Sequence, residues 1–143
     1  MTAADLRALA RRVCEEQPSR ELHKDIARAL GMAPSPTVTS GYGWREDDSG
    51  WWCETGEDMR APRETIYPPR WLHSLDAAAS LIPAGWGGSM DWGNAGVKGY
   101  MALAVRDTGE RQSFTVFAPT EPQARVAAAL LARAADMEAS DAR

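Results

Sequence analysis

The chain has 143 residues, of which 44% are hydrophobic, and its 16 Lys and Arg against 20 Asp and Glu give a net charge of −4. This length and composition favour one folded domain over residues 1–143 and exclude a chain that is disordered throughout. Mild acidity argues against a protein that coats nucleic acid or an anionic membrane, because both tasks need a concentrated basic face.

Two further features concern the compartment. No apolar run approaches the roughly 18 residues of a membrane span, and the N-terminal residues lack the apolar block of a signal peptide. Only two cysteines are present, Cys14 and Cys53, which is too few for a disulfide framework. We therefore expect a cytoplasmic protein without a membrane segment.

Residues 1–34 predict a helical hairpin. Apolar residues repeat at helical spacing over residues 5–17, and Pro18 ends this helix. Ser19 is a suitable cap for a second helix, which Gly31 would end in the left-handed conformation. Because the connection is only a couple of residues long, we expect the two helices to be antiparallel.

Residues 35–72 form an aromatic and acidic middle segment. Aromatic residues stand on both sides of the polar stretch 46–50, a pattern that predicts a short hairpin. Prolines at 62, 68 and 69 make residues 58–70 a poor candidate for a central strand, so we expect a loop there.

Residues 73–138 alternate helical and strand patterns, followed by a tail, 139–143, that we expect to fray. Ser74 caps a predicted helix that runs to Ile82, and Thr120 begins a long Ala-rich helix with a capping box. Three strands are predicted between these helices, at 86–92, 97–106 and 112–118.

The strand patterns also indicate how the predicted sheet is covered. The last two strands are joined by a tight turn, which makes the sheet antiparallel. Both of their faces carry mostly apolar or small residues, whereas a face open to water would carry more charge. The sequence therefore predicts an α+β protein in which a small antiparallel sheet lies between two helical layers, a three-layer αβα sandwich.

Three segments resemble a known family. Residues 25–31 are similar to the opening motif of the phage ABA sandwich domain family, residues 74–86 resemble its central motif closely, and residues 118–134 are similar to its closing Ala-rich helix. Trp51 and Trp52 stand where members often carry a short aromatic strand. The resemblance implies a small helix–sheet–helix protein from a bacteriophage or prophage, and it implies no activity, catalytic residue or cofactor.

Catalytic and metal-binding patterns are not found in the sequence. The soft ligands His23, His73, Cys14 and Cys53 do not have the spacing of a zinc site, and no Gly-x-Ser-x-Gly or Gly-x-x-x-x-Gly-Lys motif is present. Glu54 follows Cys53 directly, and a neighbouring carboxylate disfavours a thiolate. We therefore expect no catalytic residue, no metal and no cofactor.

Six tryptophans are the unusual feature of the composition. They can fill a small core beneath the middle segment, since Trp buries a large area. They can instead form an exposed patch that binds a partner protein, because Trp is enriched at interface hot spots. A stacking platform for single-stranded nucleic acid is disfavoured, because the surrounding residues are acidic. The predicted binding residues are Trp44, Asp47, Asp48, Trp51, Trp52, Glu54, Trp71 and Trp92.

Two functional hypotheses follow. The first is a non-enzymatic phage- or prophage-encoded accessory protein that binds a host or phage protein, with interference in a host defence protein as its specific form. The second is a small-molecule or nucleotide-binding domain with a pocket between the sheet and the middle segment, lined by Trp86, Tyr100 and His73. The identity of the partner and the oligomeric state stay open.

Overall fold

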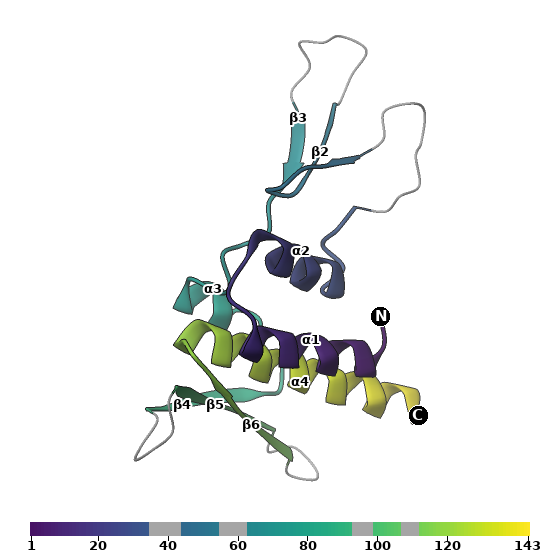
Figure 1. The fold of residues 1–143 in the computed structure, drawn as a ribbon. Helices are drawn as coiled ribbons and strands as arrows, with labels where there is room; N and C mark the ends of the chain where they lie inside the picture. Colours follow the sequence, from purple (N-terminus) through teal and green to yellow (C-terminus); the bar gives the residue numbers. More distant parts are fainter. Residues whose placement is uncertain (35–43, 55–62, 93–98, 107–111) are drawn as a thin grey trace. The chain divides into compact units, whose positions relative to one another are not determined.

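A computed structural model describes residues 1–34, 44–54, 63–92, 99–106 and 112–143 (Figure 1). Within these ranges the protein has four helices and two small antiparallel sheets, which confirms the α+β class. The elements are α1 (Ala3–Glu15), α2 (Arg20–Ala29), β1 (Arg45–Glu46), β2 (Trp51–Glu54), β3 (Arg63–Ile66), α3 (Leu75–Ala79), β4 (Gly87–Trp92), β5 (Tyr100–Arg106), β6 (Gln112–Ala118) and α4 (Glu121–Asp141).

The chain divides into two compact units. The first consists of Met1–Pro18 and Arg70–Arg143, and the second is Ser19–Pro69. Helix α1 belongs to the first unit and α2 to the second, so the predicted antiparallel hairpin of residues 1–34 stays a prediction. The single domain expected over residues 1–143 stays a prediction as well.

Side-chain caps determine where the helices begin. The Ser19 hydroxyl accepts a hydrogen bond from the Leu22 N–H, and the Thr120 hydroxyl accepts one from the Gln123 N–H, as expected for these positions. Helix α1 begins two residues earlier than the predicted range, because Thr2 and Asp5 form a reciprocal capping box. At the other end of the chain, α4 extends to Asp141 and so includes residues for which we expected a frayed tail.

The first unit contains a three-stranded sheet in the order β4–β5–β6. Three alanines of its inner face form one buried cluster with the alanines of α4, and larger inner-face side chains such as Phe114 and Val116 pack against this cluster. Small residues on both sides allow the helix to lie close to the sheet. The members of this cluster are Trp86, Ala102, Ala104, Ala118, Ala124, Ala128, Ala132 and Ala135.

Helix α1 is joined to α4 by polar as well as apolar contacts. The buried Gln123 side chain donates from Nε2 to the carbonyl oxygens of Val13 and Glu16, each at 2.9 Å. These two bonds satisfy carbonyl groups that the end of α1 leaves without a partner inside the helix. Elsewhere along helices α1 and α4, Arg7 of α1 and Glu138 of α4 form an exposed ion pair at 2.5 Å.

The described helices of the first unit, α1, α3 and α4, all lie on one side of its sheet (Figure 1). On the opposite face Ser113 and Thr115 are exposed, and Phe117 is 50% exposed. The described residues therefore show one helical layer and one sheet in this unit, and the predicted three-layer sandwich is not confirmed.

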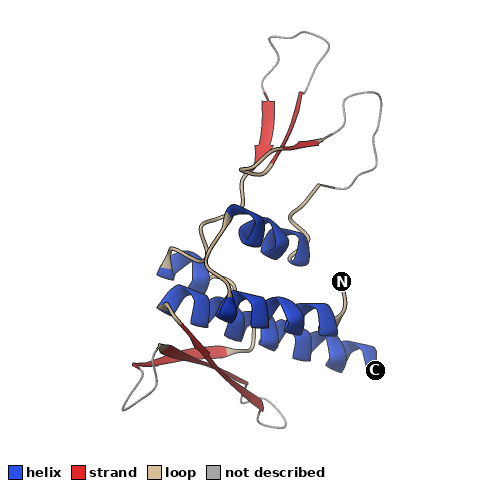
Figure 2. Cartoon of the chain, viewed as in Figure 1, coloured by secondary structure: helices blue, strands red, loops and turns tan. Residues whose placement is uncertain are grey.

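The second unit contains α2 and a smaller sheet in the order β1–β2–β3, whose strands are red in Figure 2. The predicted hairpin around residues 46–50 is present as the antiparallel pair β1–β2. Strand β3 corrects our expectation of a loop over residues 58–70. It is an edge strand, and the prolines at 62, 68 and 69 stand outside its four residues, so they interrupt no hydrogen bond of the ladder.

Candidate functional site

A four-residue turn, Asp47 to Gly50, joins β1 to β2 and exposes two carboxylates. One Asp47 carboxylate oxygen accepts hydrogen bonds from the N–H groups of Ser49, at 2.7 Å, and Gly50, at 3.0 Å. The Asp47 N–H in turn donates to the Gly50 carbonyl oxygen at 3.0 Å. Such side-chain bonds to the backbone hold a turn in one conformation. We call Asp47–Gly50 with Trp52 the acidic turn surface.

Gly50 is required where the turn meets β3. It is buried, and a Cβ atom placed on it would lie 2.1 Å from the carbonyl oxygen of Ile66. No larger residue fits without a displacement of backbone, which is a stiff neighbour. This close approach fixes the turn to the third strand of the sheet.

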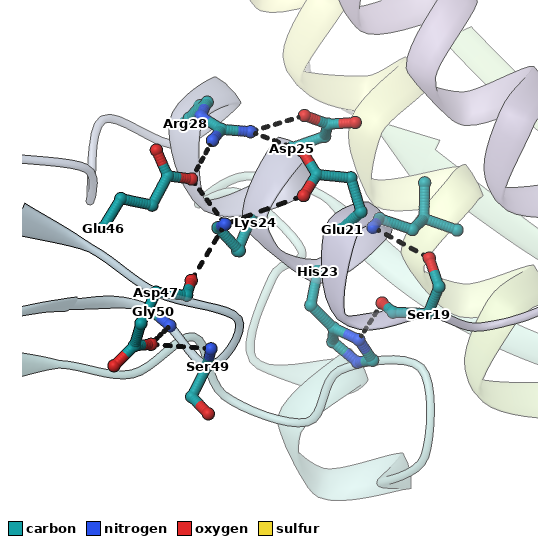
Figure 3. Close-up of polar contacts among 11 residues, drawn as sticks. Ser19, Glu21, His23, Lys24, Asp25, Arg28, Glu46, Asp47, Ser49 and Gly50 are labelled. Carbon is teal, nitrogen blue, oxygen red and sulfur yellow. Dashed lines mark hydrogen bonds and ion pairs between the residues drawn. The ribbon is translucent and has the colours of Figure 1, made fainter.

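Lys24 connects the turn to helix α2 (Figure 3). Its ammonium group lies 2.5 Å from a Glu46 carboxylate oxygen and 3.6 Å from Glu21, and it donates to the Asp47 carbonyl oxygen at 3.1 Å. Only 7% of the Lys24 side chain is exposed. A lysine buried to this degree needs such partners, because an isolated charge is strongly disfavoured away from water.

The same contact shifts the titration of both groups. The hydrogen bond from Lys24 lowers the pKa of Glu46 below its usual value, and the hydrogen bond to Glu46 raises the pKa of Lys24. Both groups are therefore charged at neutral pH, and the attraction between α2 and β1 is fully present there.

Arg28 extends this charged cluster by one helical turn. Its guanidinium pairs with Asp25 at 2.8 Å, with Glu21 at 3.2 Å and with Glu46 (Figure 3). It also lies 5.6 Å from the ring centroid of Trp51, a distance typical of a cation–π contact. Lys24, Arg28 and Glu46 thus join helix, hairpin and a tryptophan in one network.

The predicted binding residues divide by exposure. Trp51 and Trp71 are buried, with 6% and 2% of their surfaces exposed, so they present almost no surface to a partner. This finding supports the core interpretation for those two tryptophans. Trp44 and Trp52 are half-buried, while Asp47 and Asp48 are exposed. The side chains of Glu54 and Trp92 lie outside the described part of the chain.

Trp52 is held in place by a cation. The Arg45 guanidinium lies 5.1 Å from the Trp52 ring centroid, and the two residues stand opposite each other in the β1–β2 register. The contact orders an aromatic side chain that is still partly accessible. Among the described residues of the predicted site, the accessible ones are the half-buried Trp44 and Trp52 and the exposed Asp47 and Asp48.

The residues expected to line a small-molecule pocket are engaged in other contacts. The indole N–H of the buried Trp86 donates to both carboxylate oxygens of Asp136, at 3.0 and 3.1 Å, and Arg106 lies 4.9 Å from its ring centroid. Tyr100 is half-buried and His73 is exposed. Trp86 therefore acts as a core residue with a satisfied polar group.

Neither a metal centre nor a membrane helix emerges from the described residues. Among them, no group of three or more His, Cys, Asp or Glu side chains could hold a metal ion. Burial raises the pKa of the Cys14 thiol, which disfavours the reactive thiolate. None of the helices in the described part of the chain combines the length and apolar character needed to span a bilayer.

The comparisons with known proteins add nothing to this geometry. No protein family, no curated protein and no solved structure matches the chain. The resemblance to the phage ABA sandwich domain family therefore stays a prediction.

Sequence reasoning missed Lys24 and Arg28, the two cations of α2 that pair with Glu46, the residue before the acidic turn surface. Their spacing of four residues, interleaved with Glu21 and Asp25, was the available signal, because residues four apart lie on one side of a helix. The sequence pattern does not indicate that Lys24 is buried, since lysine is almost always exposed.

Proposed function

We propose that the protein is a non-enzymatic accessory protein, encoded by a phage or prophage, that binds a partner protein through the acidic turn surface in the bacterial cytoplasm. The phage origin follows from the sequence resemblance. A host defence protein with a basic surface is the specific partner that this hypothesis favours, because negative charge on a fixed turn complements such a surface.

The observation that carries the proposal is that the carboxylates of the turn are exposed while its backbone is held by several contacts. Asp47 bonds its own turn, Gly50 contacts β3 closely, and Lys24 ties the turn to α2. A surface that is already ordered loses little conformational entropy when it binds. Beside it, Trp52 supplies a half-buried aromatic side chain of the kind that contributes most to protein interfaces.

The three-layer sandwich is part of the same proposal. The resemblance implies helices on both faces of the main sheet, and α1, α3 and α4 account for one layer. A second layer would cover the face on which Phe117 is 50% exposed. A layer of this kind would explain why Met101, Leu103 and Phe117 stand on that face.

The test is capture of partner proteins from a bacterial lysate on the immobilised chain, followed by titration with the purified captured protein. Asp48→Lys reverses one exposed charge in the turn, and we expect at least a tenfold weaker affinity. Glu15→Lys is the matched control, because it makes the same change of charge at an exposed position on α1. Trp52→Ala should weaken the same complex.

The salt dependence separates this proposal from nonspecific adsorption. Binding through the acidic turn surface should weaken as salt rises, because exposed charges are screened. The proposal is wrong if Asp48→Lys and Glu15→Lys bind the captured protein equally, or if the affinity does not change with salt. Circular dichroism of each variant shows that the fold is retained.

A further inference from the structure

The edges of the two sheets differ in how they are protected against pairing with another chain. Natural proteins protect an edge strand by making it short or by placing charges or prolines in it, and glycine also weakens a strand. Strand β1 has two residues, Arg45 and Glu46. Strand β3 begins with Arg63 and Glu64, and β4 begins with two glycines and includes Asp91. Three of the four edges are therefore protected.

Strand β6 is the exception. It has seven residues, Gln112 to Ala118, and none of them is charged, glycine or proline. It is one of the two outer strands of its sheet, because the strand order is β4–β5–β6. In the part of the chain that the structure describes, no strand pairs with its outer side. Alternate residues of such a strand direct their N–H and carbonyl groups away from the sheet.

The residues beside this edge are suited to a contact. Ser113 and Thr115 are exposed, and the adjoining Phe117 is 50% exposed. In the register of β5 with β6, Phe117 stands beside Met101 and Thr115 beside Leu103. Neither β6 nor its neighbours Met101 and Leu103 carry a charge, although the chain as a whole has a net charge of −4.

The absence of charge in β6 favours a second copy of the chain over a charged partner. An edge without charge gains no electrostatic attraction from an acidic or basic partner, and it meets no repulsion when it pairs with itself. Two identical strands can always pair antiparallel about a twofold axis, which is the commonest symmetry of soluble oligomers. Around Thr115, the central residue of β6, this pairing places Ser113 opposite Phe117 and Gln112 opposite Ala118.

We propose that β6 pairs antiparallel with β6 of a second copy, with Thr115 opposite Thr115, so that two three-stranded sheets form one six-stranded sheet. The two Thr115 side chains lie on the same face of this sheet and support each other across the twofold axis. This self-association is independent of the partner binding proposed for the acidic turn surface, because β6 belongs to the first unit and the turn to the second.

The first test is the mass of the full chain in solution by light scattering after size exclusion, over a wide concentration range. The chain mass is 15.6 kDa, and we expect the wild type to approach twice this value as concentration rises. Thr115→Lys places two like charges directly opposite each other and should keep the protein monomeric. Thr115→Val, the matched control, keeps a β-branched neutral residue and should dimerise like the wild type.

The second test determines which residues of the two β6 strands stand opposite each other, and it does not depend on whether Thr115→Lys folds. A disulfide requires Cα atoms closer than about 7 Å. Opposite residues of antiparallel strands are about 4.5 to 5.5 Å apart in either kind of pair. Thr115→Cys should therefore form a 115–115 disulfide under mild oxidation, whereas Ser113→Cys should form no 113–113 disulfide, because each Ser113 stands opposite Phe117. Peptide mapping distinguishes these links from any made by Cys14 or Cys53.

Three results would overturn the proposal. The wild type could stay at the monomer mass at every concentration. Thr115→Lys could dimerise as the wild type does. The Ser113→Cys chain could cross-link as fast as the Thr115→Cys chain, which would exclude the register centred on Thr115.

Discussion

The interactions inside the first unit differ from those inside the second unit. In the first unit, alanines of α4 pack with Ala102, Ala104 and Ala118 in one apolar cluster. The ion pair of Arg106 with Asp136, at 2.8 Å, contacts Trp86 of this cluster.

In the second unit, Lys24 and Arg28 of α2 form ion pairs with Glu46 of the hairpin, and Arg28 also lies 5.6 Å from the Trp51 ring centroid. Leu22 and Ile26 of α2, which neighbour these charged residues in the sequence, are fully buried. One unit depends mainly on apolar burial, and the other depends to a large degree on charge.

This difference has consequences for function. Apolar packing varies little with pH or salt, whereas ion pairs with one exposed partner respond to both. The stability of the unit that carries the acidic turn surface should thus depend more strongly on pH and salt than that of the first unit. Four substitutions test the comparison, beginning with the largest expected effect.

The strongest test of the first unit is Trp86→Ala. Trp86 is only 7% exposed, and its ring centroid lies 5.7 Å from that of Phe114. Its indole N–H donates a hydrogen bond to Asp136. Removal of this side chain should lower the free energy of unfolding by about 3–5 kcal/mol, measured by urea denaturation with circular dichroism. Trp86→Phe keeps the ring contact but removes the N–H donor, so its loss should be only about 1–2 kcal/mol. A loss below about 1 kcal/mol for Trp86→Ala would contradict the assignment of Trp86 to the core.

In the second unit, Gly50→Ala tests the close approach of the turn to β3. The added methyl group would meet the Ile66 carbonyl oxygen at 2.1 Å, so we expect a loss of about 3 kcal/mol in the free energy of unfolding. Gly87→Ala is the control, because the nearest atom to its Cβ, the Val105 carbonyl oxygen, is 3.9 Å away. Equal melting temperatures for the two variants would show that the close approach is not as described.

Lys24→Met tests the ion pairs of the second unit. The substitution keeps the apolar stem but removes the donor to Glu46 and to the Asp47 carbonyl oxygen. We expect a loss of about 1–3 kcal/mol, measured by urea denaturation. Arg20→Met, at an exposed position on the same helix, should change stability by less than about 0.5 kcal/mol. A neutral Lys24→Met would mean that the apolar contacts of the unit are sufficient.

The smallest expected effect concerns pH and Glu46→Gln. Because the pKa of Glu46 is lowered in the folded protein, ionised Glu46 stabilises the fold above the ordinary glutamate pKa. This stabilisation is lost as pH falls through the lowered pKa. The wild type should therefore melt at a higher temperature than Glu46→Gln at pH 7, and the difference should shrink as pH falls below the ordinary glutamate pKa of about 4.3. The lowered pKa values of Asp5 and Glu138 affect both chains alike, so an unchanged difference between them would contradict the role of Glu46.

Local signals in the sequence predicted the elements well. Ser19 and Thr120 begin helices because a side-chain oxygen in the right place accepts a backbone hydrogen bond, an interaction that depends on neighbours only three residues away. The β5–β6 hairpin and the β1–β2 hairpin likewise depend on short-range alternation. Strand β3 was missed because its four residues contain no strong alternating pattern and pair with β2 across a segment outside the described residues.

The site could be predicted only in part. The sequence located the acidic turn, since a polar stretch between aromatic residues is visible without a structure. It could not distinguish the buried Trp51 from the half-buried Trp52, because burial depends on which side of β2 meets the rest of the unit. The burial of Lys24 depends on Glu46, a partner 22 residues away, and no local pattern reports such a contact.

Hydrogen exchange of the wild type at low and at high salt tests the central claim most directly, because it reads both units in one molecule. At about 1 M salt the screening length falls to about 3 Å, so the ion pairs of Lys24 and Arg28 should weaken. We predict faster exchange of the amides of β2 and β3, and a clearly smaller change for those of β5 and α4, where ion pairs such as Arg106–Asp136 accompany an apolar cluster. Equal acceleration in both units, or no acceleration in β2 and β3, would contradict the claim that charge holds the second unit together.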